Sequence, residues 1–538
     1  MSGSAPAHRP VLAVKGLTVP LPPGADRPFA VEDVSFEILP GEIVCVVGES
    51  GSGKSVSSFS IMGLLDPALR PSHGEIRFGD RDLLRLPDKE LRALRGLAMS
   101  MIFQEPKTAL SPTMTVGRQI EEPLRIHLRM TAAQRRARMR ELLRLVNLPE
   151  PDKLARRYPH QLSGGQRQRV MIAMALALEP ALLIADEPTT ALDVTTQAQI
   201  LAEIKQIQRR TNTAVLFVTH DFGVVADIAD RVVVMQKGRI VEQGPVAAVL
   251  TAPTHDYTRS LMAAIPGVHN RTERAAPEQA PVILQLDGLS KTYPPSGFAF
   301  RQTAHRALDN VNLVVRRGET LAVVGESGSG KSTMARCVSG LIPATAGSIE
   351  IDGRPIDAIG AGERARLLQF VFQDPNRSLD PRWTVGKSLS EGLRNLGVPR
   401  KQALDRASEL MAKVGLGAAA VDRYPHEFSG GQRQRLCIAR AISMEPRLLI
   451  ADEAVSALDV SVQAQILKLL ATLQKELQLS MIFVTHDLRV AVQISDRIAV
   501  MHQGQVVEIG PALEIFRNPQ HAYSRRLFEA LPGRGLSA

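Results

Sequence analysis

The chain has 538 residues, of which 44% are hydrophobic, with a formal net charge of +10 at pH 7 and three cysteines without paired spacing. This length allows more than one domain. No apolar run approaches the roughly 18 to 20 residues of a membrane-spanning helix. The cysteines indicate reduced core residues rather than disulfides or a metal site. The N-terminus lacks a signal peptide's apolar core, so we expect a cytosolic chain. The arginines are interspersed with acidic residues, which favours a solvated basic face, near an anionic membrane for instance, over a nucleic-acid groove.

The first strongly patterned element is a buried strand at residues 42–49 that leads into a phosphate-binding loop. The run EIVCVVGE is almost wholly apolar, as expected for a strand covered on both faces. A glycine-rich P-loop pattern follows it and opens a helix, and its backbone N–H groups would surround phosphate oxygens. Lys54 should reach the β- and γ-phosphates, and Ser55 should ligate Mg²⁺. We therefore expect binding of a nucleoside triphosphate by Gly48, Glu49, Ser50, Gly51, Ser52, Gly53, Lys54, Ser55 and Val56.

Gln104 ends a short strand and begins a loop that contains Pro106. Its amide can ligate Mg²⁺ and contact the attacking water without adding charge, and its loop can report occupancy of the γ-phosphate position. Residues 115–160 are rich in Leu, Ala and Arg at helical spacing, which predicts a helical subdomain inserted into the sheet domain. Residues 133–146 should form a helix in it whose apolar stripe belongs to the core.

Two further apolar strands, at residues 181–187 and 214–220, end in polar side chains. Asp186 is costly to bury unless it has a partner, and water-linked Mg²⁺ is the natural one. The adjacent Glu187 can polarise the attacking water. His220 is expected to hydrogen-bond the γ-phosphate or to orient that water.

The first unit closes with a hairpin and a tail. Residues 231–244 should turn at Gly238, and residues 253–266 should form an amphipathic helix with a Tyr and a Leu on its inner face. The polar segment after it, residues 267–281, is expected to be a linker that spans at most roughly 50 Å.

The second half repeats these elements in the same order, which indicates duplication of a domain. Its strands are expected at 320–326, 447–453 and 480–486, its helical subdomain at 384–426 (including a helix at 403–414), and its hairpin turn at Gly504. We predict an α/β fold with two tandem P-loop NTPase domains, at 1–266 and 282–538, each with an inserted helical subdomain and an antiparallel β subdomain. The equivalent site residues are Gly325, Glu326, Ser327, Gly328, Ser329, Gly330, Lys331, Ser332, Thr333, Gln373, Asp452, Glu453 and His486.

Two signatures, LSGGQ at residues 162–166 and FSGGQ at 428–432, complete a resemblance to the ATP-binding cassette (ABC) transporter ATPases over essentially the whole chain. In that family two domains pair head to tail, and each ATP lies between one P-loop and the other domain's signature. The resemblance implies two shared sites that hydrolyse ATP, and the loops ending at Asp193 and Asp459 match the family's loop that crosses the dimer seam. The signature residues that it assigns to ATP are Ser163, Gly164, Gly165, Gln166, Ser429, Gly430, Gly431 and Gln432.

The resemblance also implies roles in catalysis and metal binding. The expected catalytic residues are Glu187, His220, Glu453 and His486, and the expected Mg²⁺ ligands are Ser55, Gln104, Asp186, Ser332, Gln373 and Asp452. Family members usually stack adenine on an aromatic residue, which Tyr293 matches and Leu21 does not, so we hypothesise weaker or less base-selective binding at the first site. A second departure, Ala454 where Pro188 stands in the first half, should matter little.

The tails at 253–266 and 519–532 resemble the peptide/nickel subfamily of bacterial importers. This resemblance implies two permease subunits and a separate solute-binding protein as partners, at the cytoplasmic face of the inner membrane, with docking around 105–114 and 374–383. The alternative is a soluble twin-cassette ATPase that acts on the ribosome or on nucleic acid. The short Pro/Ala-rich linker and the lack of zinc-type cysteine pairs weigh against it, and no cysteine cluster follows the tail, so an iron–sulfur site is not implied.

Overall fold

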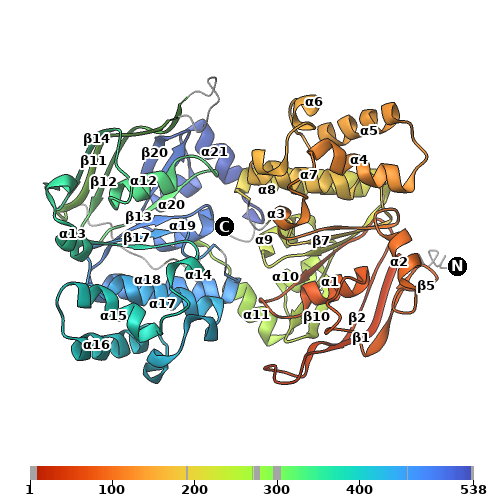
Figure 1. Cartoon of the computed structure of the whole chain (residues 1–538), viewed down its shortest axis with the longest axis horizontal. Helices are drawn as coiled ribbons and strands as arrows, with labels where there is room; N and C mark the ends of the chain where they lie inside the picture. The colour runs from red at the N-terminus through yellow and green to blue at the C-terminus, as the bar shows by residue number, and fades with distance from the viewer. Residues whose placement is uncertain are drawn as a thin grey trace. The chain divides into compact units, whose positions relative to one another are not determined.

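The computed structural model describes residues 9–189, 192–268, 271, 279–294, 304–456 and 458–534. The chain divides into two compact units, the first built mainly from residues 9–265 and the second mainly from residues 266–531 (Figure 1). The predicted linker, residues 267–281, lies mostly outside the described residues, so the expected domain bounds stay a prediction. Within the described ranges, no helix is long and apolar enough to cross a membrane.

The first unit contains an antiparallel sheet and a mostly parallel one. In spatial order, the antiparallel sheet consists of β2 (Phe29–Ile38), β1 (Leu12–Pro20), β4 (His73–Phe78) and β5 (Arg81–Asp82). The second sheet consists of β10 (Arg239–Pro245), β9 (Arg231–Gln236), β3 (Ile43–Val47), β8 (Ala214–Val218), β7 (Leu182–Asp186) and β6 (Met99–Ile102). All its strands run parallel except β10, which pairs antiparallel with β9.

Every residue of β3, β7 and β8 is buried, which confirms the prediction of strands covered on both faces. One covering layer is the antiparallel sheet: Leu12 and Val34 of that sheet share a core cluster with Val44 of β3 and Ile184 of β7. One core cluster of the unit therefore lies between its two sheets. All three cysteines of the chain are buried and free, as expected.

Helices follow the strands and build the helical subdomain. Figure 1 shows α4 to α7 of the first unit gathered away from β1 and β2. The helix predicted at 133–146 is α5, and its Met139, Leu142 and Leu143 are buried, so its apolar stripe belongs to the core as expected. The helices are α1 (Lys54–Met62), α2 (Asp88–Leu94), α3 (Pro106–Ala109), α4 (Val116–His127), α5 (Ala132–Leu145), α6 (Pro151–Leu154), η1 (Pro159–Gln161), α7 (Gly164–Ala175), α8 (Val194–Thr211), α9 (Phe222–Ile228), α10 (Val246–Thr251) and α11 (Asp256–Ala263).

The second unit repeats both sheets. Its antiparallel sheet has the order β12 (His305–Arg316), β11 (Val282–Tyr293), β14 (Ala346–Ile351) and β15 (Arg354–Pro355). Its six-stranded sheet has the order β16 (Leu368–Val371), β17 (Leu448–Asp452), β18 (Ser480–Val484), β13 (Thr320–Val324), β19 (Arg497–His502) and β20 (Gln505–Pro511). The predicted α/β fold is therefore present twice.

Its helices also correspond to those of the first unit. The helix predicted at 403–414 is the second helix of the inserted subdomain, and its Ala403, Ala407, Leu410 and Met411 are buried. The helices are α12 (Lys331–Val338), η3 (Ile356–Ala358), α13 (Ala361–Leu367), α14 (Pro375–Ser378), α15 (Val385–Asn395), α16 (Arg400–Lys413), η4 (Ala418–Asp422), η5 (Pro425–Glu427), α17 (Gly430–Ile442), α18 (Val460–Glu476), α19 (Leu488–Ile494), α20 (Ala512–Arg517) and α21 (Ala522–Glu529).

Both predicted hairpins are confirmed. The β9–β10 turn has positive φ at Lys237 (48°) and Gly238 (90°), the backbone twist that favours glycine. A Cβ on Gly238 would lie 2.8 Å from the Ala30 carbonyl oxygen, so the close approach of β2 also requires glycine there. The hairpin strands extend the parallel sheet, while the antiparallel sheet is formed by β1, β2, β4 and β5.

Candidate functional site

Four neighbouring strands in each parallel sheet end at the same edge, and the predicted functional residues stand at those ends. The neighbours are β3, β8, β7 and β6 in the first unit and β13, β18, β17 and β16 in the second. Ligand sites of parallel α/β sheets lie beyond the carboxyl ends of the strands. In the first unit these ends carry Lys54, His220, Asp186, Glu187 and Gln104.

The loop between β3 and α1 curls around the ammonium group of Lys54. Lys54 Nζ donates to the carbonyl oxygens of Gly48 at 2.7 Å and Glu49 at 2.8 Å. Gly48 has a φ of 152°, and a Cβ there would lie 2.2 Å from the Met235 carbonyl oxygen, so only glycine fits. Lys331 makes the same two bonds, at 2.7 and 2.8 Å, in the second unit.

Two buried polar groups in each loop fit a phosphate ligand. Lys54 and Lys331 are 6% and 5% exposed, and burial lowers the pKa of Lys331. Ser52 and Ser329 are also buried, and their Oγ atoms have no hydrogen-bond partner among the described residues. Phosphate oxygens would accept hydrogen bonds from the cation and from the unsatisfied hydroxyl alike. The loops are therefore chemically suited to a triphosphate.

A serine and an aspartate meet beside each loop, as the prediction of a metal site requires. Ser55 Oγ donates to Asp186 Oδ1 at 3.1 Å, and Ser332 Oγ donates to Asp452 Oδ1 at 3.0 Å. Burial raises the pKa of Asp186 to about 6 and also raises the pKa of Asp452. Hydroxyl and carboxylate oxygens suit Mg²⁺, and a cation would offset the cost of burying the carboxylate. The pair fits the expected ligand role, which stays a prediction.

The structure brings the predicted glutamine, glutamate and histidine of each unit together. In the first unit Gln104 Nε2 donates to Glu187 Oε2 at 2.8 Å, and His220 Nδ1 lies 3.4 Å from Glu187 Oε1. In the second unit Gln373 Nε2 donates to Glu453 at 2.7 Å, and the histidine Nδ1 lies 3.5 Å from the other carboxylate oxygen. The contact between glutamine and glutamate was not predicted from the sequence.

Charge and backbone conformation both single out these glutamates. Burial opposes protonation of His220, but the hydrogen bond and charge of Glu187 outweigh it, so the pKa of His220 is raised. Burial would raise the pKa of Glu453, yet the bond to His486 lowers it, and the group stays a carboxylate. Glu187 and Glu453 have φ of 45° and 50°, which is uncommon for residues with a side chain and typical of functional sites.

The signature serines cap exposed helix ends. Ser163 Oγ accepts the N–H of Gln166 at 3.2 Å, and Gln166 Oε1 accepts the N–H of Ser163 at 3.1 Å, which forms a capping box at the start of α7. Ser429 and Gln432 do the same for α17, at 3.3 and 2.9 Å. Gly164 is exposed, and a Cβ there would meet nothing within 4 Å, so this helix end is open to a ligand.

The two units differ where an adenine ring is expected. Tyr293 ends β11, is partly buried, and has Lys291 Nζ 5.4 Å from its ring centroid. Leu21 follows β1 and packs against the first unit's core. The weaker binding predicted for the first site stays a hypothesis.

A contact that the sequence does not reveal joins each tail helix to the phosphate loop of its own unit. Tyr257 Oη, on α11, accepts the N–H of Glu49 at 3.2 Å, and Tyr523 Oη, on α21, accepts the N–H of Glu326 at 3.1 Å. The sequence predicts a buried Tyr in each tail, and both are buried. Its recurrence two residues after a His in both tails is the one signal that could have pointed to the contact.

Known proteins resemble this chain over almost its whole length. The ABC transporter family model matches residues 31–190 and 308–456, and the model of the oligopeptide/dipeptide transporter C-terminal region matches residues 241–300 and 507–535. The glutathione import ATP-binding protein GsiA of Salmonella choleraesuis is 45% identical over 97% of this chain and 90% of its own length. The peptidoglycan transport ATP-binding protein YejF of Agrobacterium fabrum is 48% identical over 97% of this chain and 96% of its own.

Among solved structures, cbiO1 from Clostridium perfringens, part of the ABC transporter complex cbiONQ, is 31% identical and matches 44% of this chain and 92% of its own, with a TM-score of 0.40. The family assignment rests on the matched models and on the relatives that match 97% of the chain. Two cassettes match, and a transporter C-terminal region matches after each. The chain belongs to the ABC transporter family, as a twin-cassette ATPase that carries the C-terminal region of oligopeptide/dipeptide transporters in each half.

Proposed function

We propose that this chain is the energy-coupling ATPase of an importer for peptides or related small solutes. ATP hydrolysis coupled to transport is the activity of its family. The C-terminal regions and the relatives named for glutathione import and peptidoglycan transport favour a peptide-like solute over a role on the ribosome or nucleic acid. The main structural support is that both units contain the buried lysine, the serine–aspartate pair and the glutamine–glutamate–histidine cluster.

Each unit's own residues suggest how its site would act. The phosphate loop and Lys54 would bind the phosphates, and Ser55, Asp186 and Gln104 would hold Mg²⁺, which neutralises phosphate charge when bound. The Glu187 carboxylate is placed to accept a proton from the attacking water, because His220 and the glutamine amide fix both of its oxygens. The equivalent residues of the second unit would do the same.

We further propose that the signature of each cassette completes the ATP site of the other cassette, so that ATP binding closes the pair and hydrolysis resets it. The open N-termini of α7 and α17 support this, because each signature presents N–H groups that its own helix leaves unused. The second site would bind adenine more tightly through Tyr293. Equal preference for ATP over GTP at both sites would contradict this difference.

The partners would be two membrane permease subunits and a separate solute-binding protein, with the chain peripheral to the cytoplasmic face of a bacterial inner membrane. Docking is predicted around residues 105–114 and 374–383. A cavity of about 420 Å³ supports the second position, since Trp383, at the end of the predicted range, lines it together with Lys387, Glu391 and Arg394 of α15. An adjoining pocket of about 700 Å³ shares Val398 with it.

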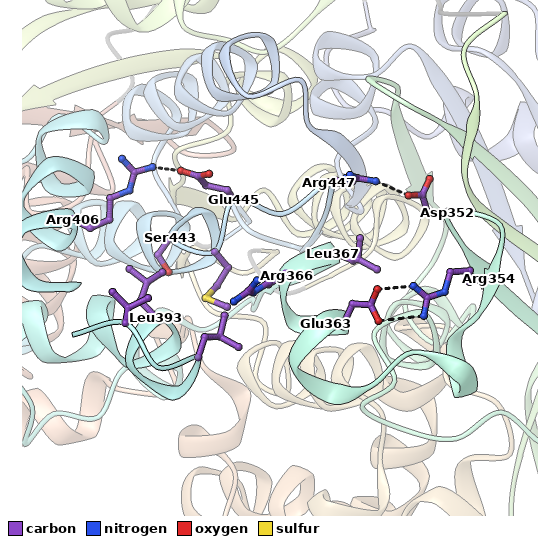
Figure 2. A pocket seen from close by; sticks show the side chains of 13 residues that line it. Asp352, Arg354, Glu363, Arg366, Leu367, Leu393, Arg406, Ser443, Glu445 and Arg447 are labelled. Atoms are coloured by element: carbon purple, nitrogen blue, oxygen red, sulfur yellow. Dashed lines mark hydrogen bonds and ion pairs between the residues drawn. The ribbon is translucent and has the colours of Figure 1, made fainter. Parts of the chain in front are cut away.

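Charged side chains dominate the larger pocket, and most of them are already paired. Figure 2 shows Glu363 bound to Arg354, and the pairs Arg406–Glu445 and Arg447–Asp352 on the other walls; Arg366 carries no such contact. Because the acids that line the pocket are already paired, Arg366, which makes no ion pair with the other described lining residues, would favour a permease segment with an acidic group.

Transport assays test the proposal directly. The chain is reconstituted with its permeases in liposomes that contain MgATP, and uptake of labelled glutathione, dipeptides and oligopeptides is followed with the solute-binding protein present. We expect uptake that requires ATP hydrolysis. A chain that hydrolyses ATP but binds no permease and drives no uptake of any of these solutes would contradict the importer function.

A further inference from the structure

Hydrogen bonds fix the tail helix of each unit to the hairpin of the same unit. Glu242, on β10, accepts the N–H of Thr254 at 2.8 Å and that of His255 at 3.3 Å. His255 Nδ1 in turn accepts the N–H of Tyr257 at 3.1 Å and caps α11. The second unit repeats the arrangement around Glu508. The direction of each tail helix is therefore set by groups outside the helix.

The tail tyrosine reaches the residue whose carbonyl holds the lysine of the phosphate loop. Tyr257 is 8% exposed, and its Oη accepts the N–H of Glu49 at 3.2 Å. The carbonyl oxygen of Glu49 accepts Lys54 Nζ at 2.8 Å. The tyrosine and the lysine thus hold the N–H and the C=O of one residue. Tyr523 and Lys331 hold Glu326 in the same way, at 3.1 and 2.8 Å.

The contact does not depend on how the tyrosine ring is packed. In the second unit the ring of Tyr523 stacks on His502 with 3.9 Å between centroids, whereas the first unit has Gln236 at the equivalent position. Burial raises the pKa of Tyr523 to about 12, so its phenol stays neutral under ordinary conditions. Since the same bond forms beside different neighbours, we attribute its recurrence to the hydroxyl itself.

We propose that Tyr257 and Tyr523 are positioning residues of the ATP sites, each of which orients the second residue of its phosphate loop and, through that residue, the lysine ammonium. The inference rests on the proposed ATP sites and goes beyond them, because it gives the transporter C-terminal region a part in nucleotide binding. Each tyrosine acts through Glu49 or Glu326. A displacement of the tail helix would therefore loosen the phosphate loop of the same unit.

Removal of the hydroxyl alone tests the proposal. In the full chain, Tyr257→Phe combined with Lys331→Ala reports on the first site, and Tyr523→Phe combined with Lys54→Ala reports on the second. We expect amide hydrogen exchange in the phosphate loop to become about tenfold faster, because the Glu49 or Glu326 N–H loses its acceptor. Affinity for a fluorescent ATP analogue should fall about three- to tenfold, with KM for ATP rising by a similar factor.

Alanine variants of serines on the same helices are the matched controls. Ser260 Oγ donates to the Tyr257 carbonyl within α11, and the Ser524 Oγ is buried without a partner among the described residues. Ser260→Ala and Ser524→Ala should leave exchange in the loop and KM at the values of the parent chains. A tail that is merely destabilised would lower kcat with the folded fraction and leave KM unchanged.

Two outcomes would overturn the inference: Phe variants with the exchange rate and KM of their parents, or Ala controls that change both as much as the Phe variants do. If one Phe variant fails to fold, the other still tests the same bond in its own unit. Parent chains that bind no nucleotide would instead contradict the proposed function. The exchange measurement on the nucleotide-free chain separates the two failures, because it reports on the bond alone.

Discussion

At the scale of single residues, each proposed catalytic glutamate is held from two sides. Glu187 receives the amide of Gln104 on one carboxylate oxygen and the imidazole of His220 on the other. The sequence predicts all three residues, because each stands at the end of an apolar strand. It could not predict the amide–carboxylate bond, which joins residues 83 positions apart and depends on the orientation of a loop side chain.

Replacement of either glutamate by glutamine tests the assignment of the base. The double variant Glu187→Gln/Glu453→Gln should lower ATP turnover by about a hundredfold or more, and each single variant should lower it by about half, because an amide cannot accept the proton of the attacking water. Turnover is measured by phosphate release from the purified chain, and nucleotide affinity should change little. Glu90→Gln, on the exposed surface of α2, is the control. Turnover at the wild-type level in the double variant would show that the base lies elsewhere.

The raised pKa of Asp186 makes a prediction about stability and pH. Its folded-state pKa, about 6, lies above the ordinary value of 3.8, so between these two pH values the folded chain binds a proton at Asp186 that the unfolded chain has released. The contribution of Asp186 to the free energy of unfolding is therefore fully present below about pH 4 and is lost as the pH rises through 6, by roughly 2–3 kcal/mol.

Asp186→Asn removes this loss, so at pH 8 without Mg²⁺ the variant should melt several degrees above the wild type. At pH 5 the two melting temperatures should lie closer together. Differential scanning calorimetry of both chains at the two pH values is the measurement. A difference between the chains that is the same at pH 5 and pH 8 would mean that Asp186 does not titrate near 6.

At the scale of elements, the strands that are buried on both faces are the ones that the sequence pattern predicts best. The runs that form β3, β7 and β8 are continuous and apolar, and they are strands throughout. An antiparallel β subdomain is expected, but the bounds of β1 and β2 are not, because Gly16 and Asp33, both with positive φ, interrupt the regular alternation of apolar and polar residues. The contact of Tyr257 with Glu49 could not be predicted either, since it spans 208 positions and involves a backbone N–H.

The packing of α7 against α8 gives a prediction within one unit. Arg169 and Glu203 form a buried ion pair at 2.9 Å in the first unit, and burial raises the pKa of Glu203. The second unit has Arg435 at the first position but Leu469 at the second. The same pair of helices therefore packs with an acid or with a leucine.

Glu203→Leu should be tolerated within about 1 kcal/mol, because Arg169 keeps its bonds to the Val146 carbonyl and to Gln199. Arg169→Leu should cost about 3–5 kcal/mol, since it leaves a buried carboxylate without its cation. Calorimetry of the two variants beside the wild type measures both shifts in melting temperature. Equal destabilisation by the two substitutions would show that the acid, and not only the arginine, is needed.

At the scale of the whole molecule, the duplication leaves two units with equivalent lysine, serine–aspartate and glutamate groups but different outer surfaces. Both hold the buried lysine, the serine–aspartate pair and the glutamate cluster. Trp383 is the single tryptophan of the chain, and the first unit has Met114 at that position. The Lys387 ammonium lies 3.8 Å from the Trp383 ring centroid. Intrinsic tryptophan fluorescence therefore reports on the proposed docking cavity of the second unit alone.

Addition of permeases in lipid nanodiscs should shift the Trp383 emission to shorter wavelength, because a docked segment would exclude water from the partly buried ring. Lys387→Glu should weaken permease binding about tenfold or more by reversing a charge in the cavity, while ATP hydrolysis by the free chain stays unchanged. Empty nanodiscs are the control for lipid contact. If the chain co-sediments with the permeases while its emission stays unchanged, the second unit docks through a surface other than this cavity.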